Sequence, residues 1–355
     1  MNLPLSIDAG KWKGGHVQGI AVDTKKGFAY FAFTTVLVKT DLLGNTVGTV
    51  KGLVGHLGCI DLNPEDGRLY GSLEFKNDAI GKGIFKGLGL DGAPAENSFY
   101  IAIFDVDKID RHDMDAEQDG VMTAVYLPQV TEYYEGTGEN GLPHRYACSG
   151  IDGTSFGPYF GATADSPTML MVACGIYKDA TREDNDHQII FCYDWRKFAA
   201  AEKPLSQKAP HHSAILPDKT CFFYTGNTDW GVQNLCYDPY TRYWLVCVYK
   251  GIKPQFPNYT MYLIDGTVAP KMSELKGLNE QGLLLTAAPV GMIHKESGIR
   301  GFCFKWGDTG VHALGDGRFY FSHHGRTEDK LHTCVAKLYR YTGEAPDGFA
   351  EIPTE

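Results

Sequence analysis

The chain repeats a hairpin pattern at an interval of about forty residues, and this repeat limits the folds available to it. When residues 15–34 are aligned with the sequence forty residues further on, the matched pairs are His16 and His56, Asp23 and Asn63, Gly27 and Gly67, and Tyr30 and Tyr70. Each copy reads as an apolar strand, an acidic turn and a strand rich in aromatic residues. The same pattern returns in "ACSGIDGTSFG" with "TMLMVACGIYK", in "WGVQNLCYDPYTRYWLVCVYK" and in "GVHALGDGRFYFSHHG".

Further apolar runs follow each hairpin, so each unit is predicted to be a four-stranded antiparallel sheet. The units cover approximately residues 15–53, 55–130, 144–226, 227–290 and 298–355. A single sheet of this size leaves faces and edges exposed, whereas stacking the units into a closed ring covers them. We therefore predict an all-β fold, one β-propeller domain over residues 1–355 with five four-stranded blades. The first fourteen residues are expected to add the outer strand of the last blade and to close the ring.

Two alternative architectures remain at this point. If "GLLLTAAPVG" and "GIRGFCFKWG" belong to a separate blade, the ring has six blades rather than five. A two-sheet sandwich also contains many short strands, but it gives no reason for the repeat. The 42 glycines, 20 tyrosines and 19 phenylalanines suit any of these folds, because glycine supplies positive φ in tight turns and aromatic residues favour pleated sheets.

Net charge and cysteine content limit the partners and the cellular compartment that we expect for this protein. The formal charge of -10 repels nucleic acid and anionic membranes over most of the surface, so we expect neither as a partner. The nine cysteines occur singly, without a CxxC pair, and most lie in apolar runs, as expected for reduced thiols in a core. We find no signal-peptide pattern and no apolar run of about eighteen residues, and we expect a cytoplasmic protein.

The topology of a blade predicts where functional side chains gather. The innermost strand begins at the end of the ring where the second, antiparallel strand ends, so these strand ends meet at one mouth of the central channel. The candidate catalytic residues there are His16, His56, Glu74 and His324. The candidate substrate-binding residues are Gln18, Lys76, Asp152, Tyr177, Lys178, Trp230, Gln233, Asn234, Tyr249, Lys250 and His323. Convergence of polar groups on a concave surface is typical of an active or binding site.

Side chains from separate blades are also candidate metal ligands. One set, suited to a divalent ion such as Mn²⁺ or Zn²⁺ that polarises a carboxylate or activates water, is His16, His56, Gln233 and His324. Another set, suited to Ca²⁺ in a structural role, is Asp152, Asn234 and Asp308. No nucleotide cofactor is expected, because the glycines and lysines of "KGIFKGLGLDG" lack the strand-to-helix context of a phosphate loop. The insertion that contains them, "IGKGIFKGLGLDGAPAEN", is predicted to be flexible.

The blade pattern resembles that of the five-bladed β-propeller superfamily across nearly the whole chain. That superfamily includes arabinanase-like glycosidases, apyrase-like nucleotidases and olfactomedin-type binding domains, so the resemblance implies the propeller fold. The resemblance is one of pattern only: the "NDPNG" motif of invertase-like enzymes is absent. "SGIDGTSF" differs from the Asp-box of sialidase-type propellers in the position of its aspartate and in having phenylalanine for tryptophan. No catalytic residue is therefore transferred from these families.

The residue types at the predicted mouth favour an enzyme. Lysines, histidines, tyrosines and amides suit an anionic, oxygen-rich ligand, so we expect a hydrolase or lyase acting on a small anionic, carbohydrate-derived substrate. An arabinanase-like mechanism is a further option and would place two carboxyls among Glu74, Asp152 and Asp308 roughly 5 to 9 Å apart. The alternative to an enzyme is a propeller that binds a ligand or a protein and holds a structural ion in its channel.

Overall fold

The computed structural model describes residues 3–353, and in it the sequence repeat forms the same hairpin turn in the first two sheets. The carbonyl of Asp23 accepts from the N–H of Gly27 (2.8 Å), and the carbonyl of Asn63 accepts from that of Gly67 (2.9 Å). Both glycines have positive φ, +78° and +71°, a conformation that strains residues with a Cβ. The repeat in the sequence is therefore a repeated turn between strands.

The first two sheets are antiparallel meanders. The first contains β2 (Val17–Asp23), β3 (Phe28–Phe33), β4 (Val36–Asp41) and β5 (Thr46–Lys51), with β9 (Met114–Asp115) added in parallel to β5. The second contains β6 (His56–Leu62), β7 (Leu69–Phe75), β8 (Ser98–Phe104) and β10 (Met122–Tyr126). Strands β7 and β8 are buried along their whole length, as expected for strands covered on both faces by neighbouring sheets.

The third and fourth sheets are less regular. The third contains β11 (Cys148–Pro158), β12 (Thr168–Ile176), β13 (His187–Tyr193) and β14 (Lys219–Tyr224), and continues into β19 (Gln281–Leu284) and β18 (Lys271–Glu274). Residues 271–284, which the sequence pattern assigned to the fourth unit, thus lie at the edge of the third sheet. The fourth contains β15 (Thr228–Asp238), β16 (Tyr243–Lys250) and β17 (Met261–Asp265). Single bridges from β17 to Ala287 and Phe302 take the place of a fourth strand, near the ribbon of β20 (Met292–Ile293) and β21 (Arg300–Gly301).

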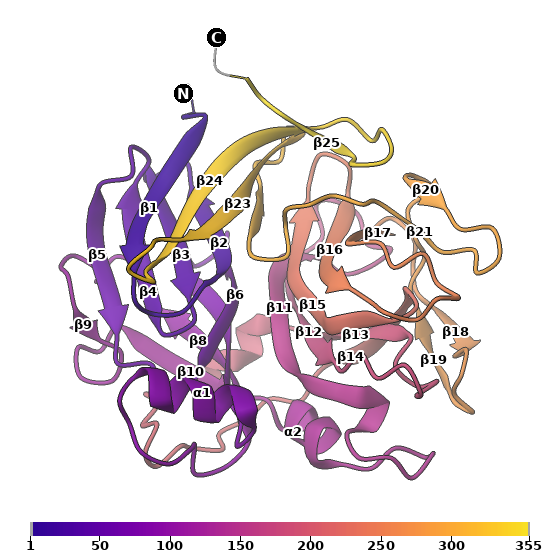
Figure 1. The fold of residues 1–355 in the computed structure, drawn as a ribbon, viewed down its shortest axis with the longest axis horizontal. Coiled ribbons are helices and arrows are strands. Elements are labelled where there is room, and N and C mark those ends of the chain that lie inside the picture. The colour runs from indigo at the N-terminus through magenta and orange to yellow at the C-terminus, as the bar shows by residue number, and fades with distance from the viewer. Residues whose placement is uncertain (1–2, 354–355) are drawn as a thin grey trace.

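The two ends of the chain meet in the fifth sheet and close the ring. The inner strand β22 (Val311–Ala313) pairs with β23 (Arg318–Arg326), which pairs with β24 (His332–Tyr341). Strand β24 pairs in turn with β1 (Ser6–Trp12) and with β25 (Phe349–Glu351). Figure 1 shows β1 beside β24. The prediction of five blades closed by the N-terminal segment is confirmed, and the six-bladed ring and the sandwich are excluded.

Five hydrophobic clusters, one between each pair of neighbouring sheets, fill the ring. Successive residues of one strand point to opposite faces, so each strand serves two clusters. In β3, Tyr30 packs toward the second sheet and Phe31 toward the fifth; in β23, Tyr320 packs toward the first sheet and Phe321 toward the fourth. The inner strands β2, β6, β11, β15 and β22 contact one another in this order, and β22 contacts β2. The ring is therefore closed by burial of apolar side chains at every blade boundary.

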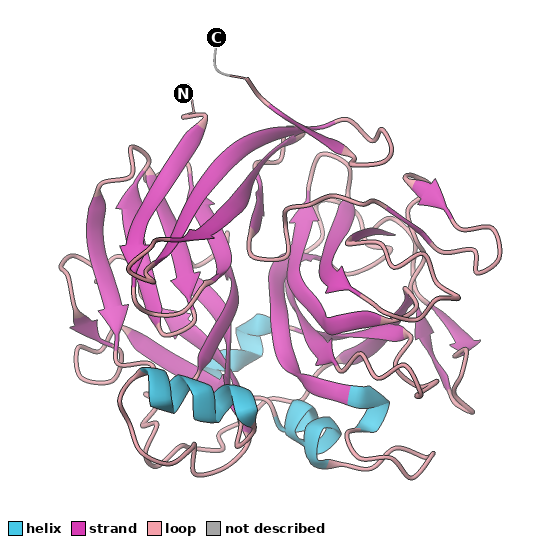
Figure 2. Cartoon of the chain, in the orientation of Figure 1, coloured by secondary structure: helices cyan, strands magenta, loops and turns pink. Residues whose placement is uncertain are grey.

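Helices occur in the connections between strands, as Figure 2 shows. These are α1 (Ala79–Gly87), α2 (Pro128–Glu135) and the 3₁₀ turns η1 (Arg145–Ala147) and η2 (Trp195–Ala200). The prediction that the insertion after β7 is flexible is wrong at its start, because residues 79–87 form α1. The side chain of Asp78 caps this helix by accepting from the N–H groups of Ile80 and Gly81. No helix within residues 3–353 is long and apolar enough to cross a membrane.

Candidate active site

A pocket of about 660 Å³ opens at the mouth of the channel where the inner strands begin. The predicted residues that line it are His16, Gln18, His56, Glu74, Lys76, Asp152, Trp230, Gln233 and Tyr249. They belong to the first four sheets and lie at or near the starts of inner strands or the ends of the second strands. The pocket thus joins side chains that are far apart in the sequence.

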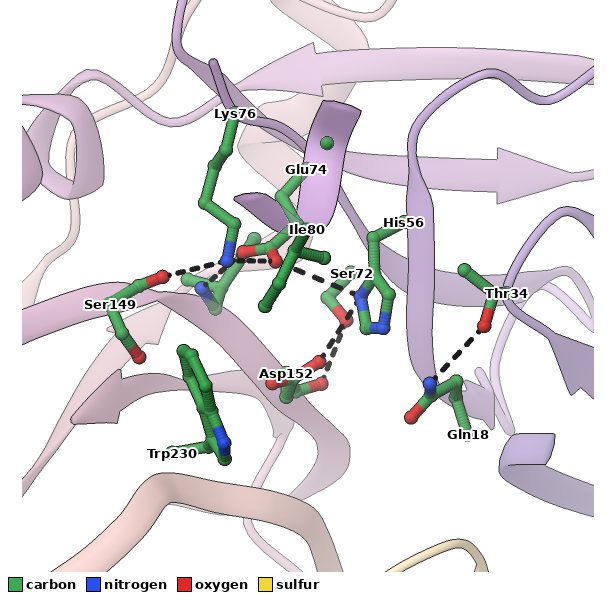
Figure 3. A network of polar contacts seen from close by, with 12 residues as sticks. Gln18, Thr34, His56, Ser72, Glu74, Lys76, Ile80, Ser149, Asp152 and Trp230 are labelled. Atoms are coloured by element: carbon green, nitrogen blue, oxygen red, sulfur yellow. Dashed lines mark hydrogen bonds and ion pairs between the residues drawn. The ribbon is translucent and has the colours of Figure 1, made fainter. Parts of the chain in front are cut away.

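In this pocket His56 lies between the carboxyl groups of Glu74, which is buried, and Asp152, which is half-buried (Figure 3). It is the first residue of β6 and pairs in register with Glu74 of β7. Its Nδ1 is 3.5 Å from Oδ1 of Asp152 and 3.7 Å from Oε1 of Glu74. Burial, together with the nearby charge of Lys76, lowers the pKa of His56 to about 3. The imidazole is therefore neutral at physiological pH.

Glu74 and Lys76 form a buried ion pair beside His56. Nζ of Lys76 is 2.6 Å from Oε1 of Glu74 and donates to the carbonyl of Ser149 (2.9 Å). The N–H of Ile151 donates to the other carboxylate oxygen, Oε2 (3.1 Å). Burial raises the pKa of Glu74, while the charge of Lys76 and the N–H of Ile151 oppose the rise. The carboxylate of Glu74 is thus held by an ionic donor and a backbone donor.

Asp152 has fewer partners than Glu74. Gln233 donates to its Oδ2 (3.1 Å), whereas Oδ1 of Asp152 and Nδ1 of His56 make no hydrogen bond with any residue in the described chain, 3–353. Burial, together with the charge of Glu74, raises the pKa of Asp152 well above its ordinary value. The raised pKa favours the protonated form of Asp152, and Nδ1 of the neutral His56 lies 3.5 Å from its carboxyl group.

A glycine allows the two acids to approach. Gly150 has a φ of +125°, and a Cβ at this position would lie 2.0 Å from Oε2 of Glu74. Two residues later, the carbonyl of Asp152 accepts from Oγ of Ser72 (2.8 Å), which fixes the start of β11 against β7. The first glycine of the segment "SGIDG" therefore occupies a position where no other residue fits.

A second group of histidines lines the pocket near the first blade. The amide of Gln18 donates to Nε2 of His16 (3.1 Å) and to Oγ1 of Thr34 (3.3 Å). Because an amide nitrogen only donates, Nε2 of His16 accepts and the ring is neutral. Burial, with the nearby rings of His324 and His332, lowers the pKa of His16 to about 4. The ring of His332, which also lines the pocket, lies 6.4 Å from that of His16 between centroids.

Helix α1 supplies an apolar wall that the sequence reasoning missed. The residues of α1 and its C-cap that line the pocket are Ile80, Gly83, Ile84, Gly87 and Leu88, the spacing of one helical face. The helix lies close to β7 because Gly81 has no side chain: a Cβ there would be 1.7 Å from the carbonyl oxygen of Lys76. The N-cap at Asp78 and the aliphatic residues four apart were signals of this helix, but the abundance of glycine concealed them.

Three cations at the pocket were also missed. Lys13 lies between β1 and β2, whereas Arg326 and Lys330 belong to the hairpin that joins β23 to β24. In the described part of the chain, none of the three forms an ion pair, although Asp329 lines the same pocket. The hairpin reaches the pocket because β23 continues to Arg326 instead of ending near His323, as the sequence pattern suggested.

Six predicted residues do not line the pocket: Tyr177, Lys178, Asn234, Lys250, His323 and His324. Tyr177 packs on Trp230, and Lys178 pairs with Asp229 at 2.6 Å on the surface. Lys250 is exposed.

The other three residues of this set make contacts within the protein. The amide of Asn234 donates to the carbonyls of Gln18 (2.9 Å) and Asp308 (3.1 Å). His323 stacks on Trp306 with 3.7 Å between centroids, and Nδ1 of His324 lies 3.1 Å from Oγ1 of Thr309. The contacts of Asn234 join the fourth blade to the first and the fifth, whereas those of His323 and His324 lie within the fifth.

Three of the four side chains predicted as metal ligands contact other groups of the protein. His56 faces two acids, the amide of Gln233 bonds Asp152, and His324 bonds Thr309. Within residues 3–353, no group of three or more histidine, cysteine, aspartate or glutamate side chains is arranged to hold a metal ion. A divalent ion at the pocket therefore stays a prediction, which metal analysis of the purified protein tests.

Comparison with known proteins finds distant structural similarity. No protein-family model and no curated protein matches the chain. The soluble aldose sugar dehydrogenase of Escherichia coli is 9% identical, with a TM-score of 0.37, over 93% of this chain and 98% of that one. A GH43 β-1,3-galactosidase is 12% identical, with a TM-score of 0.40, over 95% and 96% of the two chains. The Bacillus subtilis arabinanase Arb43A is 8% identical, with a TM-score of 0.39, over 94% and 97%. Similarities this low support no conclusion about family or function. The fold is therefore assigned from the strand pairing alone.

Proposed function

We propose that this protein is an enzyme, a hydrolase or lyase that transfers a proton to and from a small anionic, carbohydrate-derived substrate. One observation carries the proposal: a pocket-lining imidazole, His56, has its Nδ1 3.5 Å from the half-buried Asp152 and 3.7 Å from the buried Glu74. Acid–base catalysts typically gather titratable groups in a pocket, where burial and neighbouring charges shift the pKa values of these groups.

The two acids differ in the role that their surroundings favour. Lys76 and a backbone N–H hold Glu74, whereas Asp152 has an unpartnered oxygen and the more strongly raised pKa. Neighbouring acids with unequal environments take unequal roles, one as the proton donor and the other as the fixed charge. Asp152 is therefore the proton store, and Glu74 stabilises the positive charge that develops on His56.

The proton passes through His56. Asp152 gives its proton to Nδ1 while Nε2 of the same ring protonates the oxygen that leaves the substrate, so the imidazole is neutral before and after the step. The ionised Asp152 then recovers a proton through His56. In a hydrolase this proton comes from the attacking water; in a lyase it comes from the carbon that loses hydrogen as the double bond forms.

The cations at the pocket edge explain why we expect the substrate to be an anion. Lys76 is neutralised by Glu74, so recognition falls to Lys13, Arg326 and Lys330, which line the pocket without forming an ion pair in residues 3–353. A protein with a net charge of -10 that carries unpaired cations at its pocket draws an anionic substrate to that place.

Assay of aryl glycosides of uronic acids tests the proposal, with aryl glycosides of neutral sugars for comparison. We expect release of the aryl alcohol from acidic sugars, and His56→Ala should lower kcat/KM about 10²- to 10⁴-fold because the proton path is lost. Ultraviolet absorbance of an unsaturated sugar product identifies a lyase. Lys178→Ala, which changes an exposed ion pair outside the pocket, is the matched control. Turnover that survives His56→Ala in a folded protein, or no turnover of any acidic sugar, contradicts the proposal.

A further inference from the structure

The pocket has an apolar side that a small sugar acid does not explain. Three aliphatic side chains of the α1 segment, Ile80, Ile84 and Leu88, line it at intervals of four residues. A surface helix of a globular protein normally turns such a stripe toward the core. In α1 the one buried residue is Gly81, which touches Lys76 just after β7, while Ile80 and Ile84 are half-buried and Leu88 is 42% exposed. The protein therefore covers the apolar stripe of this helix only in part.

The same face of α1 has room for a ligand. Gly83 and Gly87 lie in the stripe between the aliphatic residues, and a Cβ at either position would meet no atom within 4 Å. Glycine within a helix costs up to about 1 kcal/mol of helix stability relative to alanine. At Gly83 and Gly87 no neighbouring atom is close enough to require glycine, so packing does not explain why these positions lack a side chain. Their effect in the structure is a groove along the helix, bordered by aliphatic side chains.

The groove begins at the proposed proton donor. Ile80 lines the pocket and also borders a narrow crevice together with His56 and Glu74. Figure 3 shows Ile80 beside the Glu74–Lys76 pair. From Ile80 to Leu88 the stripe extends about 12 Å along the helix axis. A group attached to the atom that His56 protonates therefore has an apolar surface next to it.

We infer that α1 forms a subsite for an apolar substituent, so that the substrate is an alkyl or aryl derivative of an anionic sugar; this rests on the proposed function. The aliphatic side chains provide no hydrogen-bond donor or acceptor for hydroxyl groups, whereas they match a hydrocarbon chain or ring. The unpaired cations Lys13, Arg326 and Lys330 bind the anionic part. The pocket then takes an amphiphilic molecule, with its charged part at the β23–β24 hairpin and its apolar part along α1.

Calorimetric titration of the whole protein with two probes, methyl β-D-glucuronide and n-hexyl β-D-glucuronide, tests the subsite by binding alone. Each fully buried methylene strengthens binding about fourfold. We expect the hexyl compound to bind at least about tenfold more tightly. Gly83→Leu places a side chain in the groove at a position where a Cβ meets no atom within 4 Å, and it favours the helix, so it should reduce the preference to about threefold or less. Lys82→Leu adds the same side chain outside the pocket lining and should preserve the preference.

The outcomes separate the subsite from the proposed function. Equal affinities for the two probes, a preference that survives Gly83→Leu, a preference lost equally in Lys82→Leu, or binding of neither probe overturns the subsite. Turnover of both glucuronides with equal affinities overturns the subsite and leaves the proposed function standing. A hexyl preference that depends on Gly83, without turnover of either compound, supports the subsite and overturns the proposed function.

Discussion

Two of the three lysines buried within residues 3–353 pair with a carboxylate, and the contrast between these two separates a structural ion pair from a candidate catalytic one. Lys76 at the pocket and Lys253 between the third and fourth blades have side chains that are 4% and 2% exposed. Each lies 2.6 Å from a carboxylate oxygen, of Glu74 in one case and of Asp186 in the other. Burial, charge and distance therefore do not distinguish the two sites.

The difference lies in what surrounds each pair. Nζ of Lys253 donates to Asp186 (2.6 Å), to Oδ1 of Asn185 (2.8 Å) and to the carbonyl of Arg182 (2.5 Å). No buried polar atom of these four residues lacks a partner within residues 3–353, although a hollow of about 260 Å³ reaches the pair.

At Lys76, the neighbouring Nδ1 of His56 and Oδ1 of Asp152 remain unpartnered. A closed network stabilises a fold, whereas unpartnered polar atoms in a pocket are free to act on a ligand.

The largest effect expected from this contrast is on turnover. Asp152→Asn keeps the shape of the side chain but removes the stored proton, so kcat should fall about 10²- to 10⁴-fold. Thermal stability should change little, because the replaced oxygen makes no hydrogen bond within residues 3–353. Asp186→Asn, the same substitution made in the closed network, is the control. Steady-state kinetics that show equal losses for the two variants would remove the distinction between the sites.

The next effect is on stability, and it is expected at Lys253 instead of at the pocket. Lys253→Met leaves the carboxylate of Asp186 buried without its cation, which should lower the free energy of unfolding by about 3–5 kcal/mol. Substrate turnover per folded molecule should stay at the wild-type level. Urea denaturation measures the loss, with Lys178→Met as a control that breaks an exposed pair and should cost less than about 1 kcal/mol. A stable Lys253→Met protein with impaired turnover would mean that the closed network belongs to the active site.

The ring and one side of the pocket can be predicted from the sequence, because both follow from local rules. Alternating apolar residues and turn glycines such as Gly27 and Gly67 fix the hairpins, and closure of their edges fixes the ring. Antiparallel pairing of the first two strands of a blade then places His56 opposite Glu74.

The other parts of the pocket depend on distances that no local pattern contains. Strand β22 is three residues long while β23 has nine, so His323 and His324 lie within a strand and Arg326 reaches the mouth instead. The approach of α1 depends on Gly81 fitting against Lys76, a contact between a helix and the end of the strand before it. That Lys76 is neutralised by Glu74 is likewise a matter of side-chain packing.

A smaller effect concerns pH. The folded protein holds the pKa of His56 at about 3 against 6.5 in the unfolded chain, so the unfolded state binds more protons between these values. Stability attributable to this group is present above about pH 6.5 and is lost as the pH falls toward 3, by at most about 1.4 kcal/mol per pH unit. Relative to wild type, His56→Gln should therefore become progressively more stable on acidification. Parallel urea midpoints for the two proteins from pH 7 to pH 4 would show that His56 is not held neutral.

The smallest effect distinguishes Lys76 and Lys253 from the cations at the pocket edge. Arg326 has no carboxylate partner within the described chain and lines the pocket, so its charge is available to a substrate anion. Arg326→Ala should raise KM for an acidic sugar about tenfold with kcat nearly unchanged, because binding is lost equally in ground and transition states. KM for a neutral analogue should not change. Lys178→Ala, which removes a cation already paired with Asp229, should leave both KM values at the wild-type level.

Added salt should raise the wild-type KM for the acidic sugar and affect the Arg326→Ala enzyme less, since screening acts on an attraction that the variant no longer has. If kcat falls and KM does not, Arg326 acts on the reacting atoms, and the cations at the edge belong with His56 and Asp152 instead of serving only to bind the anion.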